Sequence, residues 1–79
     1  MNKDLNRDLW CLKELMRTRR RYLGLRQKDA AVKSGVAVNT ISKSECGDGV
    51  MGLESFLLVV EAYGLKLKLV DKDGVEWKV

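Results

Sequence analysis

Four glycines divide the first 64 residues of the chain into segments that each have the length of a helix. They are Gly24, Gly35, Gly47 and Gly64. Glycine favours the left-handed backbone position that ends many helices, and the sequence contains no proline that would interrupt one. In the first segment the apolar residues at positions 5, 9, 12, 16 and 23 follow the repeat of a helix. The pattern predicts helices over residues 4–23, 26–34, 38–46 and 53–63.

After residue 64 the apolar period changes to the alternation of a β-strand. Three leucines alternate with two lysines over residues 65–69, and a second alternation follows the turn sequence DKDG. A three-residue loop with Gly74 at positive φ pairs Leu69 with Trp77 and brings the large apolar side chains to one face. A two-residue turn would instead place large apolar side chains on both faces of the hairpin. The sequence therefore predicts a half-buried β-hairpin over residues 65–79.

The length of 79 residues allows a single domain. We expect a mostly α fold, with residues 1–64 as its helical part and residues 65–79 as a C-terminal β-hairpin of the same domain. The chain has no histidine and only two cysteines, which excludes Ser–His and Cys–His catalytic pairs and histidine-containing zinc sites. We therefore expect no catalytic residue, no metal and no cofactor, and hence not an enzyme.

The sequence has no apolar run that could cross a bilayer, and its first eight residues are polar where a signal peptide needs an apolar core. These features predict a cytoplasmic protein without a membrane partner. In that compartment Cys11 and Cys46 are expected to be reduced thiols. A disulfide between the two cysteines is the alternative.

The charge of the chain is unevenly distributed. Residues 1–43 contain eleven basic and four acidic side chains, whereas residues 44–79 contain four basic and seven acidic ones. A concentrated positive charge attracts polyanions such as nucleic acids. On charge alone, a solvated basic surface that has no partner is the better interpretation.

The segment GLRQKDAAVKSGVAVNTISKSECG, residues 24–47, resembles the helix-turn-helix of Xre/Cro-type DNA-binding proteins. The resemblance covers about residues 17–70, because MGLESFLLVVEAYGL is similar to the fourth helix of that family. The chain looks most like HipB-type and HigA-type antitoxins and small phage or plasmid repressors. This resemblance implies a lambda-repressor-like domain of four to five helices. The residues that carry it are Gln27, Ala31, Gly35, Val36, Thr40, Ile41, Glu45, Gly47, Leu53 and Gly64.

The resemblance also implies roles for individual side chains. The positions that face DNA bases are Val38, Asn39 and Lys43, whose chemistry suits a thymine methyl, adenine and guanine, respectively. The positions near DNA phosphates are Arg26, Gln27, Lys28 and Thr40. In this family an ion pair often joins the first helix to the end of the third, and here it would join Arg20 to Glu45.

Three positions depart from the family pattern. Ala37 replaces the serine that caps the recognition helix, so a capping hydrogen bond is lost. Ala30 and Ser44 stand where larger apolar residues are usual, and the core between the helices should be smaller. Trp10 or Leu12 is a candidate to fill that space.

The helix over residues 53–63 is apolar on more than one side. Leu58, Val59 and Ala62 lie off its main stripe, and we expect them to form a homodimer interface. The alternative places Leu58 and Val59 under the hairpin of the same chain.

The sequence thus predicts an autoregulatory repressor that binds double-stranded DNA at a palindromic operator as a homodimer. An antitoxin that also neutralises a toxin protein, or a dimerisation module without DNA binding, are the alternatives.

Overall fold

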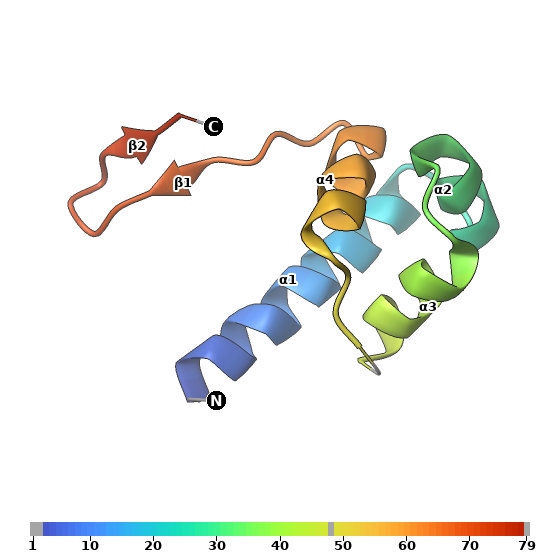
Figure 1. The fold of residues 1–79 in the computed structure, drawn as a ribbon, viewed down its shortest axis with the longest axis horizontal. Helices are drawn as coiled ribbons and strands as arrows, with labels where there is room; N and C mark the ends of the chain where they lie inside the picture. Colours follow the sequence, from blue (N-terminus) through green and yellow to red (C-terminus); the bar gives the residue numbers. More distant parts are fainter. Residues whose placement is uncertain (1–2, 48, 79) are drawn as a thin grey trace.

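The computed structural model describes residues 3–47 and 49–78 (Figure 1). Four helices are followed by a two-stranded antiparallel sheet, which confirms the predicted mostly α fold with a C-terminal hairpin. The helix limits agree with the sequence prediction to within one residue. The elements are α1 (Lys3–Tyr22), α2 (Gln27–Ser34), α3 (Val38–Cys46), α4 (Leu53–Ala62), β1 (Leu69–Val70) and β2 (Glu76–Trp77).

The turn between α2 and α3 depends on Gly35. Its φ of 77° is left-handed, and its N–H donates to the carbonyl oxygen of Ala31 at 2.9 Å. Val36 follows with its side chain buried, and the N–H of Val36 donates to Oγ of Ser34 at 3.2 Å. The glycine thus reverses the chain, and the valine anchors the turn on the core.

The core is small and is formed mainly where α2, α3 and α4 meet. Ile41 of α3 and Val59 of α4 are each 1% exposed, and Ala30 of α2 is fully buried. Met16 of α1 is half-buried and packs against this cluster. Ala30, whose small side chain led us to expect a reduced core, is therefore completely shielded from solvent.

One predicted interface residue was assigned to the wrong side of α4. The face of α4 that meets the core contains Phe56, Val59, Val60 and Tyr63, which is itself a helical stripe. Val59 therefore lies in the core, and the prediction that it faces a partner is wrong. Ala62 is half-buried and also packs against the core, whereas Leu58 is exposed.

The hairpin has the predicted register. Leu69 is opposite Trp77 and Val70 is opposite Glu76. Gly74 has a φ of 84°, as the three-residue loop requires. The turn is closed by the carboxylate of Asp71, which accepts hydrogen bonds from the N–H groups of Asp73 and Val75 at 2.9 and 3.0 Å.

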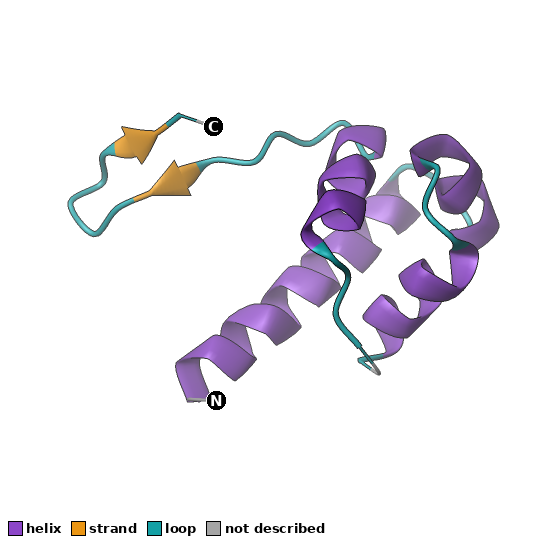
Figure 2. Ribbon diagram, viewed as in Figure 1, coloured by secondary structure: helices purple, strands orange, loops and turns teal. Residues whose placement is uncertain are grey.

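The hairpin does not lie on the helices of its own chain, and the predicted half-buried face is exposed. Residues 65–68 lead the strands away from the end of α4, so the hairpin projects from the helices as an arm (Figures 1 and 2). Trp77 is 66% exposed and Leu69 is 57% exposed. The alternative that placed Leu58 and Val59 beneath this hairpin is therefore wrong in the single chain.

Candidate nucleic-acid interface

Helix α3 has an inner side that packs on the rest of the protein and an outer side that faces solvent. Ile41 fixes the inner side in the core, and Glu45 is paired within the protein. On the outer side Asn39 and Lys43 are exposed. Val38 is also exposed, but it lies at the first turn on the stripe that contains Ile41 and Glu45. Thr40 is half-buried at the first turn. The three predicted base-reading side chains are therefore all exposed on one helix, two of them on its outer side.

The first turn of α3 has no side-chain cap. Ala37 occupies the N-cap position with φ −58° and ψ 138°, and its carbonyl oxygen accepts from the N–H groups of Thr40 and Ile41 at 3.0 and 3.2 Å. The first N–H groups of a helix have no carbonyl partner within it and carry a partial positive charge. This end of α3 is suited to a nearby anion, and the alanine leaves it open.

The predicted phosphate-binding side chains at the start of α2 differ in whether their positive charge is already paired with a carboxylate. Arg26 is exposed and pairs with Asp29, whose Oδ2 accepts from both the backbone N–H and Nε of Arg26 at 3.0 Å. The hydrogen bond from the Arg26 side chain is the main cause that holds the pKa of Asp29 below its usual value. Lys28 is exposed beside this pair. The positive charge of Arg26 is thus partly balanced, and Lys28 supplies the more available cation.

A hydrogen-bond network joins α1, α2 and α3 behind the exposed side chains. Nε and Nη2 of Arg20 donate to the two carboxylate oxygens of Glu45, each at 2.7 Å, which is the predicted ion pair. Nε2 of Gln27 donates to Oε1 of Glu45 at 3.1 Å. Both charged side chains are buried, and two parallel bonds to one carboxylate fix an arginine firmly. Gln27 therefore steadies α3 from within the protein, a role that the family resemblance implied, although its partner Glu45 was not identified from the sequence.

The network also determines how these groups ionise. Burial alone would raise the pKa of Glu45, but the hydrogen bonds from Arg20 and Gln27 and the charges of Arg20 and Arg17 outweigh it, so the pKa lies below its usual value. The hydrogen bond to Glu45 likewise raises the pKa of Arg20. The pair is charged at neutral pH.

Two further side chains of α1 bind the rest of the protein and were not identified from the sequence. Nε of Arg19 donates to the carbonyl oxygen of Tyr63 at 3.0 Å, next to the end of α4. Nζ of Lys13 donates to the carbonyl oxygen of Gly49 at 2.8 Å, in the loop before α4. Because both acceptors are backbone carbonyls, no residue type at the far end signals the contact.

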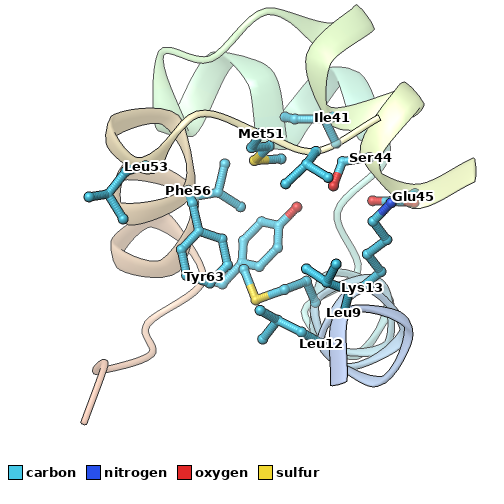
Figure 3. A pocket seen from close by; sticks show the side chains of 13 residues that line it. Leu9, Leu12, Lys13, Ile41, Ser44, Glu45, Met51, Leu53, Phe56 and Tyr63 are labelled. Carbon is cyan, nitrogen blue, oxygen red and sulfur yellow. The ribbon is translucent and has the colours of Figure 1, made fainter. Parts of the chain in front are cut away.

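An apolar hollow of about 250 Å³ opens between α1, α3 and α4 (Figure 3). Ser44, one of the two small side chains that led us to expect a reduced core, lies in its wall. Leu12 lines the hollow without filling it, and Trp10 is not part of its lining and is 64% exposed. The expectation that one of them fills the space is therefore wrong.

Comparison with protein families, with curated proteins and with solved structures finds no match for this chain. Helices long and apolar enough to cross a membrane are absent from the part of the chain that the structure describes. Among the same residues, no cluster of three or more acidic, cysteine or histidine side chains that could hold a metal ion is present. Cys11 and Cys46 are exposed free thiols, so the alternative of a disulfide between them is not observed.

Proposed function

We propose that the chain is a sequence-specific DNA-binding transcriptional regulator, a cytoplasmic autoregulatory repressor that binds a palindromic operator as a homodimer. In this proposal α2 and α3 form a lambda-repressor-like helix-turn-helix with α3 as the recognition helix. The observation that carries it is the exposure of Asn39 and Lys43 on a helix whose opposite side is fixed by Ile41 and Glu45, with Val38 exposed at the first turn. A recognition helix must be both accessible and rigidly held, because base contacts tolerate little displacement.

The exposed side chains suit the edges of bases in the major groove. The Asn39 amide can both donate and accept, as adenine N6 and N7 require, and the Lys43 ammonium can donate to guanine O6 and N7. Val38 offers an apolar contact for a thymine methyl. On the flanks Lys28, Arg26 and Thr40 would bind phosphates, whereas the amide nitrogen of Gln27 is already used by Glu45.

Selection of bound sequences from random DNA, followed by titration of the selected duplex by fluorescence polarisation, tests this proposal. Asn39→Ala and Lys43→Ala should each weaken binding by about 1–3 kcal/mol per half-site and relax the preference at one base pair. Arg7→Ala, which removes an exposed cation near the start of α1, is the matched control and should leave affinity unchanged. Equal affinity for selected and random DNA would contradict the proposal.

A second candidate function is that of an antitoxin that binds a partner protein. The observation that favours it is the exposed aromatic surface of α1, where Trp10 is 64% and Tyr22 is 77% exposed. Aromatic side chains are enriched at protein interfaces. Co-purification of the product of a neighbouring gene with the wild-type chain, and its loss with Trp10→Ala, would support this function.

A further inference from the structure

The hairpin arm, residues 67–78, is amphipathic but buries neither of its faces. One face carries Leu67, Leu69 and Trp77, all exposed. On the other face Nζ of Lys68 lies 3.7 Å from Oε2 of Glu76. A two-stranded hairpin is at best marginally stable in water without a surface to cover its apolar face. The arm therefore requires a covering surface that its own chain does not provide.

The accessible surface and the radius of gyration of the chain are both larger than those of a compact monomer of the same size. The accessible surface is 6193 Å², whereas a compact monomer of 9.0 kDa is expected to expose about 4,900 Å². The radius of gyration is 13.2 Å, against about 11.6 Å for a compact chain of this length. The excess surface of about 1,300 Å² exceeds the roughly 800 Å² that each partner buries in a typical specific interface.

The hollow between α1, α3 and α4 has complementary properties. Its walls are mostly apolar side chains, among them Leu12, Met51 and Phe56 (Figure 3). The ring of Tyr63 is 1% exposed, and its hydroxyl points into the hollow, where no described residue hydrogen-bonds to it. Burial raises the pKa of this hydroxyl, so it stays neutral. Such a hollow suits an apolar anchor of aromatic size.

One carboxylate of the arm and one cation at the rim of the hollow carry opposite charges, although the arm has as many lysines as acidic residues, three of each, and the paired Glu45 also lines the hollow. Lys13 lines the hollow, and its ammonium binds the uncharged carbonyl oxygen of Gly49. On the arm, Oδ2 of Asp71 accepts from Nε1 of Trp77 at 3.0 Å, which places a carboxylate beside the indole ring. An indole inserted into the hollow would bring this carboxylate toward the ammonium of Lys13.

We propose that the arm of one copy docks on the helices of a second copy, with Trp77 in the hollow between α1, α3 and α4. The second arm docks on the first copy in the same way, which gives a two-fold dimer. The inference deepens the homodimer of the proposed function and rests on that dimer alone. Because it is tested without DNA, its failure and the failure of DNA binding are separate results.

Sedimentation equilibrium of the full chain is the first test, and neighbouring residues of β1 form a matched pair. Leu69→Lys places a charge on the apolar face, whereas Val70→Lys places it on the charged face, opposite Glu76, at an almost equal exposure, 58% against 57%. Leu69→Lys and Trp77→Ala should weaken dimerisation roughly 30-fold or more, as loss of an interface anchor does. Val70→Lys should change it less than threefold. Helical circular dichroism must be the same for all variants.

A mixing experiment distinguishes docking of the arm into the hollow from any other dimer. Ser44→Leu fills the hollow from within its own chain, and its dimerisation should be weakened to the same extent as that of Trp77→Ala. A mixture of the two variants should form a heterodimer, because the intact arm of the Ser44→Leu chain meets the intact hollow of the Trp77→Ala chain. The proposal is overturned if the mixture stays monomeric or if Val70→Lys is as damaging as Leu69→Lys. A wild-type monomer at every concentration, as when the arm folds onto its own hollow, overturns it as well.

Discussion

The guanidinium group of Arg20 makes three separate contacts with one side chain and one carbonyl. Two of its nitrogens bind Glu45 of α3, and Nη1 donates to the carbonyl oxygen of Leu25 at 2.8 Å. The contact with Leu25 holds the connection from α1 to α2, and the contact with Glu45 holds the end of α3. A single side chain thus links the positions of three helices.

Replacement of Glu45 by glutamine should destabilise the protein in a pH-dependent way. At pH 7 the substitution leaves the buried Arg20 charge without its counter-ion, and the free energy of unfolding should fall by about 3 kcal/mol. Because the pKa of Glu45 is lowered in the folded state, the pair contributes its full stability above the ordinary value of 4.5. That contribution is lost as the pH falls through the lowered pKa.

Urea titrations followed by circular dichroism between pH 3 and 7 measure this effect. The wild type should lose stability below pH 4.5, whereas Glu45→Gln should lack this part of the pH dependence. Glu54→Gln removes an exposed carboxylate at the start of α4 and should stay within about 0.5 kcal/mol of the wild type. Equal stability of the Glu45 and Glu54 variants would show that the ion pair does not hold the helices.

The individual helices and the hairpin follow closely from the sequence, but the surfaces they present do not. The glycines at helix ends and the change of apolar period are local signals, and they gave the helix limits and the pairing of Leu69 with Trp77. Helix α4 has apolar residues on several sides, so its sequence contains two possible stripes. Only packing against α2 and α3 decides that Val59 is inside. Likewise, alternation in the hairpin shows an apolar face without showing what covers it.

Part of the candidate nucleic-acid interface could be predicted from the sequence, and part could not. Exposure of Asn39 and Lys43 follows from their spacing relative to Ile41 on one helix. The bond between Gln27 and Glu45 could not be predicted, because a glutamine at the start of a helix has the same local sequence whether it binds a phosphate or a carboxylate. The hollow beside Ser44 depends on which neighbours fail to fill it, and that is a property of the whole packing.

The uncapped start of α3 can be tested as an element by the substitution Ala37→Ser. The backbone of Ala37 already has the extended conformation of an N-cap residue, so a serine hydroxyl can accept from an N–H of the first turn without rearrangement. The free energy of unfolding should rise by about 1 kcal/mol, measured by thermal or urea denaturation. Val32→Ser, on the exposed side of α2, should bring no gain. A loss of stability in Ala37→Ser would mean that the first turn of α3 has no room for the cap.

At the scale of the whole molecule, the uneven charge matters through the number of phosphates that a dimer neutralises. Each copy places Lys28 near the start of α2, and the exposed Arg26 beside it is partly balanced by Asp29. Binding of a cation to phosphate releases counterions, so the logarithm of the affinity falls linearly with the logarithm of the salt concentration. The slope is therefore a count of contacts made by both copies together.

Lys28→Ala should make this slope shallower by about 1.8, since each lost phosphate contact changes it by about 0.9 and a dimer loses two. Titrations of the selected duplex at 50 to 300 mM salt, by fluorescence polarisation, measure the slope. Lys28→Ala should weaken selected and random duplexes to the same degree, because a phosphate contact reads no sequence. Lys66→Ala removes the same charge from the connection to the hairpin and should leave the slope unchanged. An equal change of slope in both variants would mean that salt acts on the overall charge of the protein and not on a contact at the start of α2.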